Sequence, residues 1–283
     1  MAVRKIKLIV QYDGSAYSGW QVQPGKRTIQ GELVEAVSNL TGRRTFVHGA
    51  SRTDAGVSAL GQVALFEIDS PIPTQNFAEA INDRLPKNIV VTEAAEAPRG
   101  FDLISGPTSK LYRYTIYAAR RRPVLDLNRC WHLPVKLDVR AMQQAAALFV
   151  GRKDFKSFAS GKDKREITVR TIFRCCVVSS HEKNAEKLNV RVCDTRYACP
   201  EGAIRNTQYD IQHPTSKQRW VYIDVEGDGF LYNMVRNIVG TLVEVGTGRW
   251  QPEKITEIIE AKDRTAAGRL APPNGLCLMW VKY

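Results

Sequence analysis

The chain has 283 residues, of which 43% are hydrophobic, so it can bury the core of one large domain or two medium ones. Lysine and arginine outnumber aspartate and glutamate by 41 to 29, and the net charge of +12 favours a polyanionic partner such as nucleic acid. The apolar run behind the basic N-terminal residues is too short for a secretory signal, and no run reaches membrane-spanning length, so we expect no membrane partner.

The cysteines and histidines do not form the pattern of a metal site. The six cysteines include no Cys-x-x-Cys pair, and the four histidines are widely separated, so we expect no metal. Cys175 and Cys176 lie in an apolar run with the character of a strand, which predicts at least one buried thiol. Reduced thiols are typical of a cytoplasmic protein.

The first 120 residues are expected to interleave strands and helices. Apolar side chains at alternate positions from Lys5 to Tyr12 predict a strand with one buried face. A helix is expected to begin at Thr28, because apolar residues recur at helical spacing behind it, and to end before Gly42. A shorter helix is expected over 74–85, ahead of Pro86. Further strands are expected over 62–69, 89–94 and 110–118.

The remaining residues continue in the same way. Helices are expected over 137–150, 233–245 and 251–262, and strands over 171–180, 187–192, 219–226 and 276–283. The polar segment 194–217 is expected to be an insertion between two strands. Strand-rich stretches broken by single helices favour an α+β fold over a strictly alternating, doubly wound one.

A boundary is expected near residues 120–123, where three arginines and a proline interrupt the pattern. It divides the chain into an N-terminal half, 1–120, and a C-terminal half, 121–283. Each half would carry a sheet with helices packed on one face. A cleft between two such halves is a usual place for a ligand.

One carboxylate stands out within residues 51–63. Asp54 lies two positions after Arg52 and two before Gly56, so a cation can keep it ionised and a bulky ligand can approach the backbone closely. This is how a reactive aspartate is built. Taken alone, however, the same segment is more often a tight turn ahead of a strand.

Three further segments hold candidate residues. Tyr12 and Trp20 lie in an aromatic, glycine-rich segment suited to stacking on bases, unless it packs on the core. Tyr112 alternates with Arg113 along a strand, and it points either into a cleft or between sheet and helix. Arg236 lies in the first turn of a helix, where the helix dipole does not favour a cation. It therefore serves another purpose or forms a surface ion pair.

Together these segments resemble the tRNA pseudouridine synthase A (TruA) family. The resemblance runs in the family's order over nearly the whole chain. The matching residues are 12–14 through 20–21, 52–57 with 61–63, 85–86, 112–114, 154–155 with 157–158, 234–240, and 271–273 with 275–276. It implies a pseudouridine-synthase-like fold, with a mixed, largely antiparallel sheet flanked by helices.

The resemblance also implies a reaction. The expected activity is isomerisation of uridine to pseudouridine in the anticodon stem-loop of tRNA, at tRNA positions 38, 39 and 40, without a cofactor. Asp54 would be the essential group, either attacking C1′ or taking the C2′ proton, and both routes stay open. Arg236 would lie beside Asp54 and lower its pKa. Tyr112 would stack on the uracil, and its hydroxyl could take the C5 proton.

RNA contacts are expected from several other residues. Arg52 is expected to take part in base flipping, Tyr12 and Trp20 in stacking, and the cations Lys110, Arg113, Arg120 and Arg121 in phosphate contact. Each of these cations taken alone is more often a solvated surface charge. By the resemblance, the enzyme would be a homodimer with tRNA lying across both subunits and with its dimer-forming elements in 121–283.

Other functions remain as alternatives. A member of the same family could act on another RNA or another uridine, and a non-catalytic RNA-binding module would keep the basic surface without needing Asp54. A metal-dependent phosphoryl-transfer enzyme would need further clustered carboxylates, and none accompanies Asp54 in the sequence.

Overall fold

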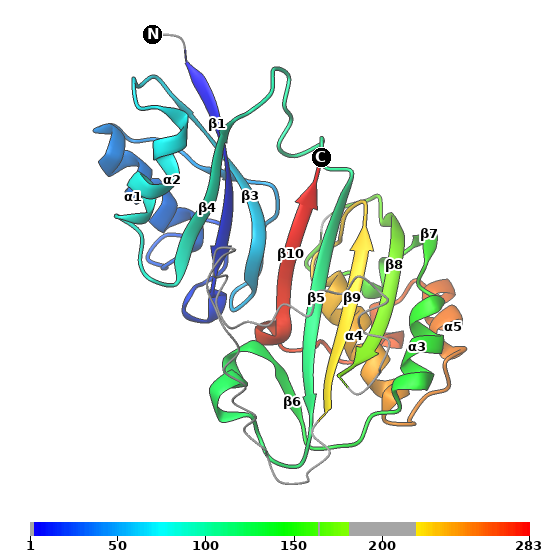
Figure 1. Cartoon of the computed structure of the whole chain (residues 1–283). Coiled ribbons are helices and arrows are strands. Elements are labelled where there is room, and N and C mark those ends of the chain that lie inside the picture. Colours follow the sequence, from blue (N-terminus) through cyan, green and yellow to red (C-terminus); the bar gives the residue numbers. More distant parts are fainter. Residues whose placement is uncertain (1–2, 164, 181–218) are drawn as a thin grey trace.

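A single mixed sheet organises the molecule. The computed structural model describes residues 3–163, 165–180 and 219–283. Its ten described strands are ordered β4-β1-β3-β10-β5-β9-β8-β7, with β2 beside β3 and β6 beside β5 (Figure 1). The strands are β1 (Arg4–Tyr12), β2 (His48–Gly49), β3 (Ser58–Ile68), β4 (Ile89–Glu96), β5 (Ser109–Ala118), β6 (Trp131–Leu133), β7 (Gly151–Asp154), β8 (Val169–Ser179), β9 (Arg219–Gly227) and β10 (Leu276–Lys282).

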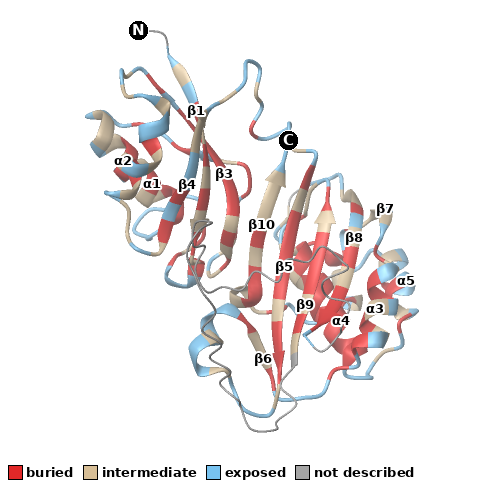
Figure 2. Ribbon diagram, viewed as in Figure 1, coloured by how far each residue is buried: buried red, intermediate tan, exposed pale blue. Residues whose placement is uncertain are grey.

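Two helices pack against the N-terminal portion of the sheet, which is formed by β4, β1 and β3. They are α1 (Ile29–Thr41) and α2 (Phe77–Asn82). The N-terminus of α1 is capped by Thr28, whose Oγ1 accepts from the Gly31 amide at 3.2 Å. Gly42 ends the helix in the left-handed conformation, at φ 69°. Figure 2 shows the buried residues between these helices and strands.

Three helices pack on the C-terminal portion of the sheet, formed by β10, β5, β9, β8 and β7. They are α3 (Val139–Ala147), α4 (Met234–Gly246) and α5 (Lys254–Ala261). All residues of α4 except Arg236 are buried, so this helix is the centre of the packing (Figure 2). Short 3-10 turns complete the architecture: η1 (Gly14–Ala16), η2 (Thr74–Asn76), η3 (Val124–Arg129), η4 (Lys156–Phe158), η5 (Arg264–Ala266) and η6 (Pro273–Gly275).

The two portions of the sheet meet where β3 and β10 pair in parallel. Only two residue pairs join them there, Ser58 with Cys277 and Ala59 with Leu278. Because β10 is the last strand of the chain, the C-terminus closes the sheet between β3 and β5 (Figure 1). Residues 51–57, the segment with the candidate carboxylate, immediately precede Ser58, the first residue of β3 in this pairing.

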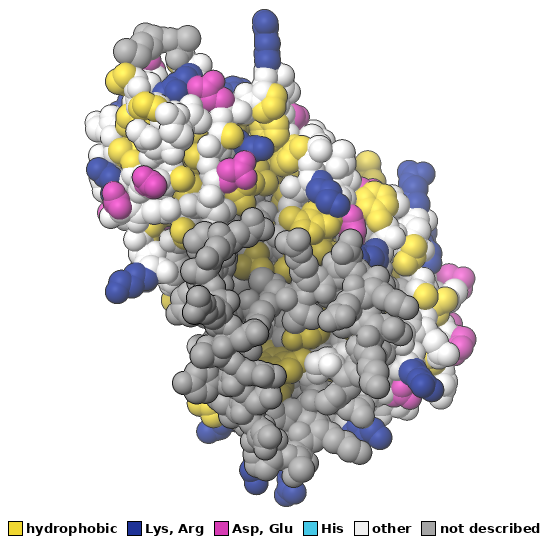
Figure 3. All heavy atoms as spheres, viewed as in Figure 1, with side chains coloured by type: hydrophobic (Ala, Val, Ile, Leu, Met, Phe, Trp, Pro, Cys, Tyr) yellow, Lys and Arg dark blue, Asp and Glu magenta, His cyan; other side chains and the backbone are white. Residues whose placement is uncertain are grey.

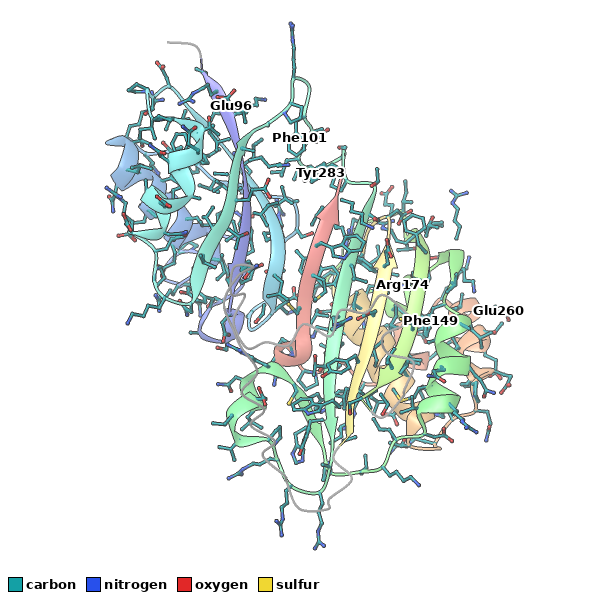
Figure 4. All side chains as sticks on the ribbon, viewed as in Figure 1. Glu96, Phe101, Phe149, Arg174, Glu260 and Tyr283 are labelled. Atoms are coloured by element: carbon teal, nitrogen blue, oxygen red, sulfur yellow. The ribbon has the colours of Figure 1, made fainter. Side chains whose placement is uncertain are left out.

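The end of β10 is also tied to the loop between β4 and β5. The rings of Phe101 and Tyr283 lie 4.5 Å apart between centroids, at the same end of the sheet (Figure 4). The Tyr283 hydroxyl donates to the Leu103 carbonyl at 2.9 Å. These contacts hold the last strand in place against residues from the first half of the chain.

Most of the expected elements are confirmed. The α+β class, the mixed and largely antiparallel sheet and the longer helices agree with the sequence, with ends that differ by a few residues. The short strands β2, β6 and β7 were not expected, because two to four residues carry no periodicity. The segment 120–123 lies between β5 and η3. The expected strand 187–192 and insertion 194–217 lie outside the described residues.

The cysteines of the described chain agree with the expectation of reduced thiols. Cys130, Cys175 and Cys176 are free thiols, and Cys175 is buried as predicted. No helix in the described ranges is long and apolar enough to cross a bilayer.

Candidate active site

The segment 51–57 is a loop that is held from inside the protein. The side chain of Gln62, which is fully buried on β3, bonds both backbone groups of Ser51. The Ser51 amide donates to Gln62 Oε1 at 3.1 Å, and Gln62 Nε2 donates to the Ser51 carbonyl at 2.6 Å. Further along the loop, the Tyr12 hydroxyl and Thr53 Oγ1 form a buried hydrogen bond of 2.8 Å. These buried hydrogen bonds fix the loop conformation, because buried polar groups are costly to leave without a partner.

The glycine-rich segment after β1 lies against the backbone of this loop. A Cβ at Gly14 would lie 2.0 Å from the Val57 carbonyl oxygen, and one at Gly19 would lie 2.7 Å from the Thr53 oxygen. The Trp20 amide donates to the same Thr53 oxygen at 3.0 Å. The glycines are therefore required for close approach of two backbones.

Asp54 lies at the partly open side of the loop. Its side chain is 22% exposed, and its Oδ2 accepts from Nη1 of Arg236 at 3.3 Å. Burial raises the pKa of the Asp54 carboxyl, and the charge and hydrogen bond of Arg236 oppose that rise. The lowering of this pKa by Arg236 agrees with the sequence-based expectation, but desolvation, which the sequence did not reveal, is the larger effect, so the net shift is upward.

Arg236 is held by three segments of the chain. It lies in the first turn of α4 with a side chain that is 12% exposed. Its Nε donates to the Ala271 carbonyl at 2.8 Å, and its Nη1 donates to Asn233 Oδ1 at 3.0 Å as well as to Asp54. The structure thus excludes the solvated surface ion pair and makes Arg236 a fixed, partly buried cation that faces the candidate carboxylate.

Tyr112 lies in the same region, on β5. Its ring is 9% exposed and meets the Phe230 ring edge-on, with centroids 5.3 Å apart. Burial raises the pKa of Tyr112 to about 12; a hydrogen bond with Ser51 opposes the shift, and the charge of Asp54 adds to it. Tyr112 is therefore a neutral phenol near neutral pH, and it senses the Asp54 charge.

Asp54, Arg236 and Tyr112 thus come together from a loop, a helix and a strand. The Arg236 to Asp54 contact joins residues 182 positions apart in the sequence. An ionisable carboxylate with a matched cation and a neighbouring aromatic ring is suited to chemistry on a planar substrate with an electrophilic carbon.

Four of the residues expected to contact RNA have side chains that are at least partly exposed. Arg52, Arg120 and Arg121 are exposed. Lys110 is half-buried, and its Nζ donates to the Ala50 carbonyl at 2.7 Å. Burial lowers the pKa of Lys110 to about 8. Lysine and arginine side chains project around the rim of the face in Figure 3.

Three other residues expected to contact RNA are buried. Trp20 is 1% exposed and Tyr12 4% exposed, and both rings belong to the hydrophobic core, so neither has a face available to a base. Arg113 is 9% exposed and forms two hydrogen bonds with Asp224, at 2.7 and 2.8 Å. These three side chains are structural in this conformation, because their partners lie in the core.

The sequence did not single out three residues that complete the site. Gln62 anchors the loop, Phe230 packs on Tyr112 and Asn233 bonds Arg236. All three lay inside segments that were noted for other residues. Their roles depend on partners far along the chain, which no local pattern reveals.

Comparison with known proteins identifies the family. The family described as "tRNA pseudouridine synthase" matches residues 8–103 and 145–283 of this chain. The chain belongs to the tRNA pseudouridine synthase family. The enzymes of this family are isomerases.

Similar full-length proteins agree with this assignment. A protein named tRNA pseudouridine synthase A from Geotalea uraniireducens (strain Rf4) is 40% identical over 282 residues, which is 99% of this chain and 100% of that one. The protein of that name from Caldicellulosiruptor bescii is 39% identical over 281 residues, again 99% of this chain and 100% of its own length. The one from Acetivibrio thermocellus is 38% identical over the same coverage.

The ion pair of Arg113 yields a first prediction. Arg113→Met should lower the free energy of unfolding by about 3–5 kcal/mol, because it leaves the Asp224 carboxylate buried without its cation. Urea denaturation measures the change. Arg121→Met, at an exposed arginine, is the matched control and should change stability by less than about 0.5 kcal/mol. Unchanged stability with weaker tRNA binding in Arg113→Met would restore the phosphate-contact role.

Proposed function

We propose that this enzyme isomerises uridine to pseudouridine in the anticodon stem-loop of tRNA, at tRNA positions 38, 39 and 40, with Asp54 as its catalytic residue. The contact between Asp54 and Arg236 is the observation that carries the proposal, since it gives the site one ionisable carboxylate with a dedicated cation. The choice of stem-loop and positions rests on the family resemblance.

The reaction needs little more than a positioned carboxylate. The bond from N1 of uracil to C1′ of ribose breaks and a bond from C5 to C1′ forms, while the C5 proton moves to N1. No redox equivalent is exchanged. Asp54 acts either by attacking C1′ or by taking the C2′ proton to give a glycal, and either role requires the ionised form.

Arg236 and Tyr112 have separate tasks in this proposal. Arg236 offsets the burial of the Asp54 carboxyl and orients its Oδ2 through the 3.3 Å hydrogen bond. By the family resemblance, the ring of Tyr112 would stack on the target uracil. Because Tyr112 is 9% exposed and packs in the hydrophobic core beside Phe230, a base reaches its ring only when a neighbouring side chain moves aside. Because its pKa is about 12, the hydroxyl of Tyr112 is neutral near neutral pH. It can take the C5 proton only as it releases its own proton, so that N1 gains one proton for the one that C5 loses.

The exposed arginines are suited to binding the negatively charged tRNA. The target uridine must leave its stack, at a cost of a few kcal/mol, and Arg52 lies exposed two residues before Asp54, where it can occupy the vacated space. Arg120 and Arg121 are exposed at the segment after β5 and would contact phosphates. Lys110 instead holds the Ala50 carbonyl ahead of the loop.

Asp54→Ala should abolish pseudouridine formation. The experiment incubates the enzyme with uridine-labelled tRNA in the presence of EDTA and counts pseudouridine after nuclease digestion. The wild type should form product without added metal, and the variant should form none above background while it still binds tRNA within about twofold.

Each rival function has its own outcome in this assay. Unchanged product in Asp54→Ala would remove the catalytic role from Asp54. Binding by the wild type with no product would favour the RNA-binding module. Product at uridines outside positions 38 to 40 would favour a family member of different specificity.

The ionisation of Asp54 predicts a pH dependence. Only the carboxylate form reacts, so the single-turnover rate should rise with pH through the pKa of Asp54 and then level off. Because burial raises this pKa, the acid limb should lie above the range of an ordinary aspartate. In Arg236→Gln the opposing cation is lost, and the limb should move upward by about 1–3 pH units. An acid limb at the same pH in both enzymes would contradict the pairing.

The resemblance also supports a homodimer in the cytoplasm. Sedimentation equilibrium should then give about twice the monomer mass of 31.8 kDa. A mass equal to one chain at micromolar concentration would contradict the dimer.

A further inference from the structure

Asn233 has an unusual backbone conformation beside the proposed catalytic pair. Within the described residues, Asn233 and Lys262 are the two non-glycine residues with positive φ, at 63° and 49°. Such conformations persist where the surrounding structure imposes them, and they gather at functional sites. Asparagine tolerates this region better than most residues.

The side chain of Asn233 does not cap the helix that it precedes. Asn233 is the N-cap of α4, where an asparagine oxygen ordinarily accepts a backbone amide of the first turn. It makes no such bond. Its Oδ1 instead accepts from Nη1 of Arg236 at 3.0 Å. Because a guanidinium only donates, it is the amide oxygen that faces Arg236.

The hydrogen bond from Arg236 to Asn233 uses the same nitrogen that contacts the proposed catalytic carboxylate. Nη1 of Arg236 also donates to Asp54 Oδ2, so one nitrogen joins the side chains of Asn233 and Asp54. The Ala271 carbonyl holds Nε of the same guanidinium. Asn233 therefore sets the orientation of the cation toward the carboxylate from the helix side.

A neutral acceptor is required at this place. A carboxylate at position 233 would share the charge of Arg236 and repel Asp54, and both effects would raise the pKa of Asp54. Among the described residues, the titratable groups that interact electrostatically with the pair are Tyr112 and Tyr114, both on β5. Burial raises the pKa of both; the Asp54 charge adds to the rise at Tyr112, and the Arg236 charge opposes it at Tyr114. An amide orients Arg236 without changing this balance.

We propose that Asn233 is a positioning residue for the isomerisation: its amide oxygen fixes Arg236 against Asp54 while it leaves the charge of the pair unchanged. This inference rests on the proposed role of Asp54. On this proposal, the bond from Arg236 to the Asn233 amide oxygen explains both the left-handed backbone conformation of Asn233 and the absence of a side-chain cap on α4.

Two substitutions separate the acceptor from the backbone conformation. Asn233→Gly keeps a residue that adopts positive φ readily and removes only the acceptor. Its kcat should fall about 10- to 100-fold, while KM for tRNA changes less than about twofold. Asn233→Asp keeps an oxygen acceptor and adds charge, so its acid limb should move upward by about one pH unit. Lys262→Gly, at the other left-handed residue, is the control and should match the wild type in kcat and pH profile.

The inference is overturned by either of two results. One is a kcat for Asn233→Gly within twofold of the wild type. The other is an acid limb for Asn233→Asp that coincides with that of the wild type. Thermal unfolding of each variant, measured alongside, shows whether a lost kcat follows from lost folding; a retained melting temperature with a lower kcat supports positioning.

A titration of Asp54 separates this inference from the proposed reaction. Carbon-13 NMR of labelled aspartate carboxyls, assigned with Asp54→Asn, follows the pKa of Asp54 in the free protein without any turnover. We expect a higher pKa of Asp54 in both Asn233 variants than in the wild type. If the pKa of Asp54 is higher in both variants but the wild type forms no pseudouridine, only the proposed function is contradicted. If the pKa values are equal and the wild type is active, only the role of Asn233 is contradicted.

Discussion

The site depends on the buried hydrogen bonds that fix residues 51–57. Gln62 satisfies both backbone groups of Ser51, and Tyr12 pairs with Thr53 in the core. Leaving any of these buried groups unpaired would cost about 1–3 kcal/mol, so other loop conformations are disfavoured before any RNA binds. The candidate carboxylate is thus presented by a loop that is held by hydrogen bonds from within the protein, as precise positioning of a reacting group requires.

The proposed role of Asp54 places two opposing requirements on its carboxylate: shielding from water and ionisation. It must be shielded enough to act on a sugar carbon away from bulk water, yet it must stay ionised, and burial works against ionisation. Arg236, on α4, offsets part of this effect, and the pairing of β10 with both β3 and β5 joins the two portions of the sheet on which the contacting residues lie. The C-terminal strand therefore links the portion of the sheet that carries the loop to the portion that carries α4.

Periodicity in the sequence predicted the fold class and the main elements, because periodicity is a local signal. The pairing of Asp54 with Arg236, 182 residues apart, was predicted only by the family resemblance. The sequence failed where a role depends on a distant partner. Arg113 looked like a surface cation until Asp224, 111 residues away, appeared on the neighbouring strand. Tyr12 and Trp20 looked like stacking residues because an aromatic, glycine-rich composition fits a base platform and also fits a backbone packed tightly on a loop. Composition alone cannot tell which of these surfaces is buried.

The most direct measurement is a crystal structure of the inactive Asp54→Asn variant with bound tRNA. The account predicts that one uridine has left its stack, that its base lies against the Tyr112 ring, and that the side chain at position 54 lies about 3–3.5 Å from C1′ or from the C2′ hydrogen, with Arg236 still beside it. A uridine that remains stacked in the RNA, or a sugar bound far from position 54, would contradict it.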